Sequence, residues 1–334
     1  MTSVKSGSVA VATAVPNCRE GRCHPMGAVD FEWMPRIAVE AETLGFDSTW
    51  LNEFMTTEKG VAARYGRTPD YFEPLTSIGF MAALTKKIRF VTATLVLPFH
   101  HPLILGRQVA TLDAMTGGRV TLGVGLGGSL EQFKALRGEL TRVNRSQIVE
   151  ESLASLRTLW TESPATFSSQ YFSFDSVELW PKPIQSPMPV WIAGDADSIP
   201  ARVAVYGDGW IDSHLSPEEV RSFRERIRSE CHSVGRTGDD IAMARQFYIS
   251  IGNTRKAAEA NVADSWPGRN DPGSIGRGSD YTVVGTPAEV RAVLRTYANA
   301  GASELCAIFV APDLERYVEQ MSLFAEGVVP GLRA

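Results

Sequence analysis

Residues 89–128 read RFVTATLVLPFHHPLILGRQVATLDAMTGGRVTLGVGLGG, and this segment contains one complete structural unit. Its pattern predicts an apolar strand, a polar loop, a helix, a tight turn and a second strand that ends in a glycine cluster. Two strands that flank a helix within about 40 residues form one βαβ unit. Repeats of this unit build either a barrel or a doubly wound sheet, so the rest of the chain decides between the two.

The alternation of strands and helices continues along the whole chain. Eight segments are predicted as strands: Ser8–Val15, Ser48–Leu51, Ile88–Leu97, Arg119–Val124, Val190–Ala193, Gly209–Asp212, Ile241–Ser250 and Glu304–Val310. Helices are predicted at Pro35–Gly45, Pro74–Thr85, Leu103–Met115, Ser129–Leu136, Ser146–Trp160, Ile199–Tyr206, Pro217–Ser233, Pro287–Gly301 and Leu314–Ala325. An open six-stranded sheet would leave two strands unplaced. The pattern therefore predicts an α/β fold, a single (β/α)8 barrel over residues 1–334.

Three irregular segments interrupt this rhythm, at residues 54–72, 166–189 and 252–280. Long irregular segments in a compact domain are usually lids or other functional loops. The first and third follow the carboxyl end of a strand, where barrel enzymes place their active sites. We expect lid-like insertions at the C-terminal mouth of the barrel, the second of them a small hairpin with alternating aromatic residues.

Composition excludes several classes of partner. The chain of 334 residues has a net charge of −5 and 21% charged residues. It has no basic block that could follow a phosphodiester backbone, so nucleic acid is not an expected partner. No apolar run reaches the roughly 18 residues of a membrane span. We therefore expect a cytoplasmic protein that acts on a small organic molecule.

Cysteine usage does not indicate a disulfide framework. Cys231 and Cys306 fall in a helical and a strand pattern and are expected in the core. Cys18 and Cys23 are followed directly by His24, which leaves two interpretations: a metal or redox site, or a mobile loop over the barrel mouth. The spacing differs from the usual zinc pair and no second pair follows, so we predict no metal centre.

The glycine cluster also has two interpretations. Gly123, Gly125 and Gly128 satisfy the dinucleotide-binding pattern GxGxxG. That pattern belongs in an early βαβ unit with an acidic residue about 20 positions further on. Here it follows the fourth strand, and Asn144 and Arg145 stand near the expected place. The alternative is that small residues let the backbone approach a flat ligand or a neighbouring strand closely.

Three segments carry a resemblance to a known family. They are FDSTWLNEFMTTE at 46–58, the run from Thr92 to Gly128, and VWIAGDADSIPARVAVYGDGW at 190–210. Together they resemble the luciferase-like flavin and deazaflavin oxidoreductases, over roughly Val9 to Val310. The resemblance implies a (β/α)8 barrel with reduced FMN, or the deazaflavin coenzyme F420, at its C-terminal mouth.

The resemblance also suggests which residues meet the cofactor. Relatives often carry a non-prolyl cis peptide on the third strand under the ring, here near Ala93–Thr94 or Thr94–Leu95. An ordinary buried strand with backbone-bonded threonines is the alternative. The backbone amides before the helix at Ile199 make an anion site, with Arg202 offsetting two nearby aspartates. The predicted cofactor-binding residues are Thr92, Ala93, Thr94, Gly125, Gly127, Gly194, Ala196 and Ser198.

The sequence departs from the family at three functional positions. Many relatives have a histidine after the acidic residue that ends strand two, and here that position is Phe54. Luciferase-type members have an arginine for the FMN phosphate where this chain has Leu126. The deazaflavin sugar-phosphate dehydrogenases have an acid where this chain has Gly128.

Few residues remain for acid–base chemistry. Asn52 and Glu53 end strand two and face the predicted mouth, and His214 follows strand six two residues after Asp212. We predict Asn52, Glu53 and His214 as the catalytic groups. The predicted substrate pocket contains Phe54, Phe99 and His100. The alternative for loop histidines is a solvated or capping role.

Flavin-type chemistry needs few catalytic side chains because the cofactor carries the reaction. We favour a monooxygenase that uses reduced FMN and O2, served by a separate flavin reductase. The first alternative is F420-dependent hydride transfer, and the second is a non-catalytic flavin-binding homologue. Family members tend to dimerise, so a homodimer is expected, with the apolar helices that begin at Pro74 and Leu103 as the contact.

Overall fold

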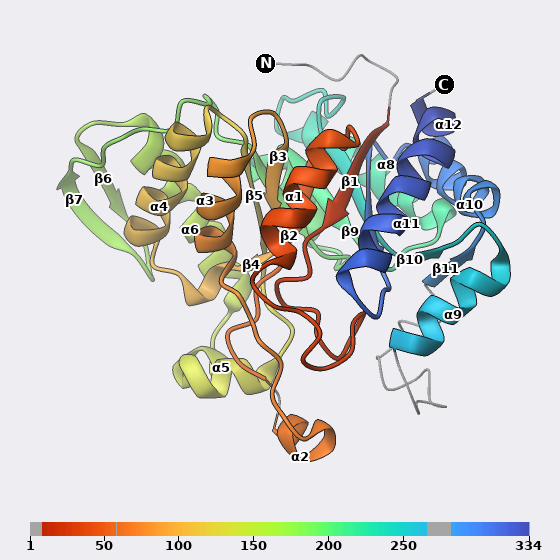
Figure 1. Ribbon diagram of the computed structural model, residues 1–334. Coiled ribbons are helices and arrows are strands. Elements are labelled where there is room, and N and C mark those ends of the chain that lie inside the picture. The colour runs from red at the N-terminus through yellow and green to blue at the C-terminus, as the bar shows by residue number, and fades with distance from the viewer. Residues whose placement is uncertain (1–8, 58, 266–281, 334) are drawn as a thin grey trace.

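The computed structural model describes residues 9–57, 59–265 and 282–333, and its centre is a closed parallel barrel (Figure 1). Within these residues eight strands pair in a ring, each parallel to its neighbours. They are β1 (Ala10–Ala14), β2 (Ser48–Leu51), β3 (Arg89–Thr92), β5 (Val120–Gly125), β8 (Val190–Ala193), β9 (Gly209–Asp212), β10 (Ala242–Ile251) and β12 (Glu304–Phe309). The pairing of β9 with β10 closes the ring, which confirms the predicted barrel.

Two further strands extend this sheet. β4 (Leu95–Val96) pairs with β5 just after β3 has ended. β11 (Thr282–Gly285) pairs with the last four residues of β10. β11 was not predicted, because the sequence before it is polar and has no strand pattern. Of the first predicted strand, Ser8–Val15, residue Ser8 lies outside the described residues.

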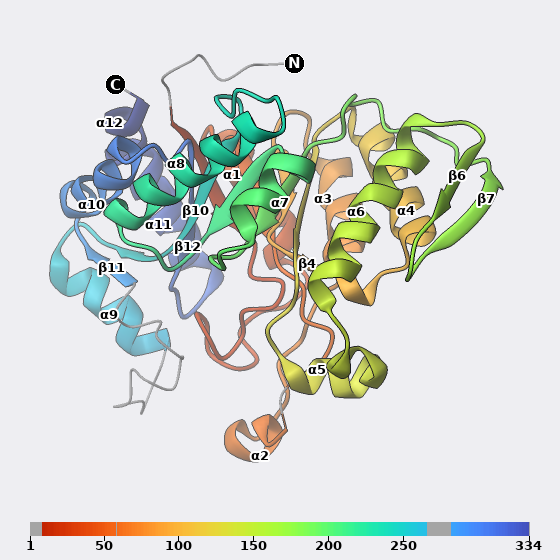
Figure 2. The same ribbon diagram turned by 180° about the vertical axis from the view of Figure 1, so that it is seen from behind.

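Helices surround the barrel (Figures 1 and 2). The outer layer consists of α1 (Trp33–Thr43), α3 (Pro74–Leu84), α4 (Pro102–Thr116), α6 (Arg145–Thr161), α7 (Ile199–Tyr206), α8 (Pro217–Ser233), α10 (Pro287–Asn299) and α11 (Leu314–Gly327). The remaining described helices are α2 (Val61–Tyr65), α5 (Leu130–Leu136), α9 (Arg255–Ser265), α12 (Val329–Arg333), and the 3-10 helices η1 (Leu97–Phe99) and η2 (Gly138–Arg142). The predicted helices are confirmed, whereas α2, α9 and α12 were not predicted.

Local sequence explains why these helices form where they do, and α8 is an example. Ser216 Oγ accepts a hydrogen bond from Glu219 N at 3.3 Å, and Ser216 N donates to the Glu219 carboxylate at 2.7 Å. This reciprocal capping box satisfies two backbone donors that the first turn would otherwise leave unpaired. Val220, Phe223 and Ile227 then face the strands at helical spacing and are buried.

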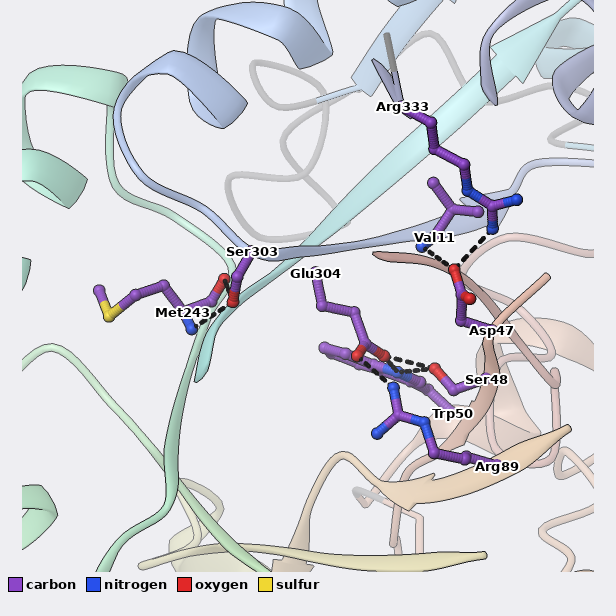
Figure 3. A network of polar contacts seen from close by, with 9 residues as sticks. All are labelled: Val11, Asp47, Ser48, Trp50, Arg89, Met243, Ser303, Glu304 and Arg333. Atoms are coloured by element: carbon purple, nitrogen blue, oxygen red, sulfur yellow. Dashed lines mark hydrogen bonds and ion pairs between the residues drawn. The ribbon is translucent and has the colours of Figure 1, made fainter. Parts of the chain in front are cut away.

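The amino-terminal end of the barrel is filled by a polar network (Figure 3). Glu304, the first residue of β12, forms an ion pair with Arg89 at 2.7 Å. Trp50 Nε1 donates to Glu304 Oε1 at 3.0 Å, and the Ser48 hydroxyl donates to the same carboxylate. The buried carboxylate is therefore paired and hydrogen-bonded, as a buried charge requires. Because this end is closed, ligand chemistry belongs at the other end.

The first predicted insertion lies at that other end. α2, within residues 54–72, and α5 extend from the end of the barrel opposite to both labelled termini (Figure 1). Of the third insertion, 252–280, the structure describes α9 up to Ser265; the part from residue 266 lies outside the described residues.

The prediction for the second insertion is only partly correct. It contains the expected antiparallel hairpin, β6 (Ala165–Ser168) and β7 (Ser173–Val177). The hairpin lies on the outer side of α4 and α6 rather than over the strand ends (Figure 1). The reason is that this segment follows a helix, not the carboxyl end of a strand. Only its turn approaches the segment after β4, where the Phe172 ring lies 5.9 Å from that of His101.

Among the described helices, none combines the length and the apolar character that a membrane crossing requires.

Candidate active site

Side chains that face the barrel interior are mostly apolar in the middle of the barrel and polar toward its C-terminal mouth. Trp50, Val91, Ala244 and Cys306 belong to one buried cluster contributed by alternate residues of successive strands, and the intervening residues pack against the helices. Further along β10 the same alternation brings Gln246 and Tyr248 to the inner face, where both are only partly buried. The interior is thus sealed below and accessible at the C-terminal mouth, the usual place of the active site in this fold.

The third strand carries an irregularity at the mouth. The peptide bond Ala93–Thr94 is cis, at one of the two positions that the resemblance suggested. Thr92 Oγ1 donates to Gly123 O and accepts from Gly123 N, both at 2.8 Å. The Thr92 hydroxyl is therefore used between strands, whereas Thr94 stays partly exposed at the mouth. This matches the backbone-bonded alternative for Thr92 and leaves Thr94 facing the mouth.

The glycine cluster makes room for this irregularity. A Cβ on Gly123 would lie 1.9 Å from Thr92 O, and a Cβ on Gly125 would lie 3.0 Å from Thr94 Oγ1. Gly127 has φ +74°, and a Cβ there would lie 2.5 Å from the Val96 side chain. Gly123 and Gly125 belong to strand β5 itself, so the dinucleotide interpretation is wrong and the close approach to a neighbouring strand is confirmed.

Asn52 and Glu53 lie side by side at the end of β2, and both are buried. Asn52 N donates to Asn17 Oδ1 at 3.2 Å, and Asn17 Nδ2 donates to Asn52 O at 2.7 Å. Asn52 Oδ1 is buried and has no hydrogen-bond partner among the described residues. A buried acceptor without a partner is costly, so Asn52 is a candidate to accept a hydrogen bond from a ligand.

Glu53 binds the segment that follows the cis peptide. Its Oε2 accepts a hydrogen bond from Val96 N at 2.7 Å, and its Oε1 lies 2.9 Å from His100 Nε2. Two residues predicted separately, as a catalytic group and a pocket residue, are thus one pair, with Glu53 buried and His100 partly exposed.

The predicted aromatic pocket residues Phe54 and Phe99 flank the contact between Glu53 and His100, and each packs against a ring of another segment. The Phe54 ring packs against Tyr71 with centroids 5.6 Å apart, and Arg22 lies 4.6 Å above it. The Phe99 ring packs against Phe133 at 4.5 Å. Both rings are partly exposed.

His214 does not join a catalytic pair with Asp212. His214 is exposed, and its backbone N–H donates to Asp212 Oδ1 at 2.9 Å. The other Asp212 oxygen forms a buried ion pair with Arg245, whose guanidinium lies 4.4 Å from the Tyr297 ring of α10. Asp212 therefore holds Arg245 in the layer between the barrel strands and helix α10.

The predicted anion site before α7 differs from expectation. Ser198 makes no side-chain cap, and Ala196 O accepts from Ile199 N at 2.9 Å. Gly194 is exposed with φ +131°. Arg202 was expected to offset the aspartates, and this is wrong: its guanidinium pairs with Glu150 of α6 at 2.8 Å. The helix directs Arg202 sideways to α6, away from the loop.

A different cation stands near Leu126. Arg145, the first residue of α6, donates from Nη1 to Gly127 O at 2.9 Å and lies 4.4 Å from the Phe133 ring. No spacing in the sequence indicates that Arg145 contacts the glycine cluster.

The loop with the two cysteines packs tightly. Cys18, Cys23 and His24 are buried, and His24 Nδ1–H donates to Ala311 O at 2.8 Å. Burial raises the pKa of Cys18 to about 12 and that of Cys23 to about 11, which disfavours the thiolates that metal and redox chemistry need. The described ranges contain no cluster of three metal-ligating side chains. The loop is part of the barrel's packing, rather than the mobile cover we expected.

Arg19, in the same loop, was not predicted as a site residue. Its Nη2 donates to Gln246 Oε1 at 3.1 Å and its Nη1 to Tyr248 Oη at 3.4 Å. Gln246 Nε2 in turn donates to Ala93 O at 3.5 Å, so these side chains span the mouth from β1 to the cis peptide. The alternation of Ala244, Gln246 and Tyr248 in β10 was the available signal for the two inward side chains.

A TIM barrel with polar side chains gathered at its C-terminal strand ends is the architecture of an enzyme. The sequence matches the family described as "Luciferase-like monooxygenase" over residues 11–278, and the chain belongs to this family. It is a luciferase-like oxidoreductase of the flavin- or F420-dependent kind.

Individual relatives include both cofactor types. The chain is 26% identical over 327 residues to an F420-dependent glucose-6-phosphate dehydrogenase from Kineococcus radiotolerans, covering 89% of this chain and 92% of the relative. Among solved structures, monooxygenase RslO1 from Streptomyces bottropensis aligns with a TM-score of 0.76 and 22% identity, covering 96% of this chain and 99% of that chain. An F420-dependent secondary alcohol dehydrogenase aligns with a TM-score of 0.78 and 18% identity, covering 98% of this chain and 100% of that chain.

The residues at the mouth fit a flat heterocycle. Such a ring offers N–H and C=O groups, and the buried Asn52 Oδ1 receives no hydrogen bond from the residues that the structure describes. Gly125 leaves the Thr94 hydroxyl without a covering side chain, and Gly194 exposes backbone at the end of β8. The mouth therefore offers an acceptor at Asn52 and a hydroxyl at Thr94 to a flavin or deazaflavin ring.

Proposed function

We propose that this protein is an F420-dependent oxidoreductase that transfers hydride to or from a small organic substrate. The observation that carries the proposal is the end-to-end match with F420-dependent glucose-6-phosphate dehydrogenases, which spans 89% of this chain at 26% identity. The neutral Leu126, where luciferase-type relatives have an FMN-binding arginine, points the same way. Arg145 supplies a cation nearby from α6, so Leu126 is supporting and not decisive.

Several residues would hold the coenzyme. Bound deazaflavin supplies a ring carbon that accepts or gives hydride. Asn52 would accept from a ring N–H, and Thr94 with Ala93 would support one face of the ring. Glu53 keeps that face in place because it binds Val96, just after the cis peptide. Arg145 would lie toward the phosphate of either cofactor.

The substrate is proposed to differ from glucose 6-phosphate. By resemblance, the position of the acid in the sugar-phosphate dehydrogenases is Gly128, which is exposed and carries no side chain to move a proton. A proton on this chain's substrate would instead be transferred near Glu53 and His100, the acid–histidine pair at the mouth.

Binding of the two cofactors to the purified full chain tests the proposal. Fluorescence titration is expected to show that F420 binds at least about tenfold more tightly than FMN, a difference of roughly 1.4 kcal/mol. Asn52→Ala should weaken F420 binding because the ring loses an acceptor, and Asn299→Ala, the same change at an exposed site on α10, should not. Equal or tighter binding of FMN would contradict the proposal.

A second candidate is the monooxygenase reaction with reduced FMN and O2. The family description over residues 11–278 favours it. Binding of reduced FMN alone, with substrate-dependent O2 consumption in the presence of a flavin reductase, would select this candidate. Binding of neither cofactor would select a non-catalytic homologue.

We also propose a homodimer through α3 and α4. These neighbouring helices expose four large apolar side chains, Phe80, Leu84, Ile104 and Met115. Exposed apolar side chains mark an interaction site where they form one contiguous patch, and these four are the candidates for such a patch. Light scattering of the wild type and of Phe80→Glu with Ile104→Glu is expected to give a dimer and a monomer. A monomeric wild type would overturn this proposal.

A further inference from the structure

Three arginines are buried in the described part of the chain, and they differ in their partners. Arg202 pairs with Glu150, and Arg245 pairs with Asp212. Arg19 has neutral partners, the side chains of Gln246 and Tyr248, and its Nε has no hydrogen-bond partner among the described residues. Arg19 is 7% exposed.

The loop holds Arg19 in this position without an ion pair to any residue that the structure describes. The amides of Arg22 and Cys23 both donate to Arg19 O at 3.0 Å, which forms a turn. The neighbouring carboxylate of Glu20 points elsewhere, accepting from Val29 N and Asp70 N at 3.0 Å each. Glu20 therefore fastens the loop to the first insertion, and the Arg19 side chain is left to reach into the barrel.

A buried guanidinium without a counter-charge is expensive. Removing an ion from water is offset only when an opposite charge and further hydrogen bonds replace the lost hydration. Gln246 and Tyr248 supply hydrogen-bonding oxygens but no full negative charge. The missing component is an anion.

The position of Arg19 indicates where that anion comes from. Gln246 connects the guanidinium with Ala93 O, beside the cis peptide. Gln246 and Tyr248, which bind the guanidinium, are only partly buried and lie on the inner face of β10 toward the mouth. A molecule that reacts with a ring lying on Ala93 and Thr94 would come within reach of Arg19.

We propose that Arg19, supported by Gln246 and Tyr248, binds a carboxylate group of the substrate. The side edge of a guanidinium offers two parallel N–H groups, the geometry that matches a carboxylate. The inference that this anion belongs to the substrate rests on the proposed function. The proposed substrate is therefore an organic acid.

Matched pairs of small ligands test the site. Acetate, benzoate and phenylacetate, each compared with its uncharged amide, are titrated calorimetrically into the full chain with and without F420. Wild type is expected to bind at least one acid about tenfold or more tightly than its amide, the range for a hydrogen bond to a charged group. Arg19→Gln should abolish this preference and Arg19→Lys should restore part of it. Arg36→Gln, an equal loss of charge on the exposed face of α1, should leave it intact.

Each outcome decides the proposal. Equal binding of acids and amides by wild type, or an unchanged preference in a folded Arg19→Gln variant, would overturn it. Loss of F420 affinity in Arg19→Gln without an effect on acids would also overturn it, because the anion would then belong to the coenzyme. If wild type binds no F420 but its preference for acids depends on Arg19, the proposed function fails and the carboxylate site stands. Circular dichroism, and Arg19→Met as a second variant, verify that the fold is retained.

Discussion

His100 Nε2 lies 2.9 Å from Glu53 Oε1, and this contact joins the end of β2 to the segment after β4. The Glu53 side chain is 1% exposed and that of His100 14% exposed. Since Glu53 also binds Val96 N, one carboxylate holds the chain at two points just beyond the cis peptide. By resemblance, relatives have a histidine directly after this acid in the sequence. Here that position is Phe54, and a histidine from another segment, His100, contacts the acid instead.

Removal of the Glu53 carboxylate is expected to destabilise the protein. In Glu53→Ala the buried Val96 N–H loses its acceptor, which costs about 1–3 kcal/mol. Glu53→Gln keeps an oxygen for Val96 and should lose less. Urea unfolding measures both, and F420 titration shows whether the supporting face of the ring has moved. Equal stability of Glu53→Ala and wild type would contradict a clamping role.

The two kinds of buried arginine should respond oppositely to the same substitution. Arg245→Met leaves the buried Asp212 carboxylate without its cation, and this is expected to cost roughly 3–5 kcal/mol. Arg19→Met removes a cation that has no carboxylate partner among the described residues, so stability should stay the same or rise. Urea unfolding of both variants makes the comparison. A large loss in Arg19→Met would show that its charge is already compensated in the free protein.

The glycines of the cluster should differ sharply in tolerance. In Gly123→Ala the new Cβ would lie 1.9 Å from Thr92 O, a backbone atom that cannot move without breaking the sheet. The loss is expected to exceed the roughly 1–3 kcal/mol typical of overpacking. Gly128→Ala meets no atom within 4 Å and should be neutral. Thermal unfolding and soluble yield check the pair, and similar values for both would contradict the role given to Gly123.

The barrel was predictable because its signals are local. Apolar strand runs, helical spacing and turn residues repeat along the chain, and β5 was predicted at Arg119–Val124 and observed at Val120–Gly125. The segment from α9 to β11 is polar and lacks such a pattern, so its strand was missed. Helix faces were less accurately predicted, since the direction of Arg202 depends on the packing of α7 against α6.

The candidate site was only partly predictable for a similar reason. Asn52, Glu53 and His100 were identified from their places at strand ends, but the pairing of Glu53 with His100 depends on the path of the chain through β3, β4 and η1. Arg19 contacts a residue 227 positions away, and no spacing in the sequence encodes such a contact. Long-range contacts of loop side chains are what the structure adds.

His24 should make stability depend on pH. Its ring is buried between Trp33 and Tyr317, and burial lowers its pKa from 6.5 to about 4, with the nearby Arg19 charge acting in the same direction and the hydrogen bond to Ala311 opposing them. Below pH 6.5 the unfolded chain binds a proton at this site and the folded protein does not, until the pH reaches about 4. The contribution of neutral His24 is therefore complete above pH 6.5 and is lost as the pH falls, by about 2 kcal/mol at pH 5. Urea unfolding between pH 5 and 7.5 measures this loss. His24→Asn, which keeps a donor for Ala311 O, and His24→Phe, which keeps a ring, are both expected to be less stable at pH 7.5 but to show a flatter pH dependence than wild type. Identical slopes in all three proteins would mean that His24 is already protonated, or already hydrated, in the folded state.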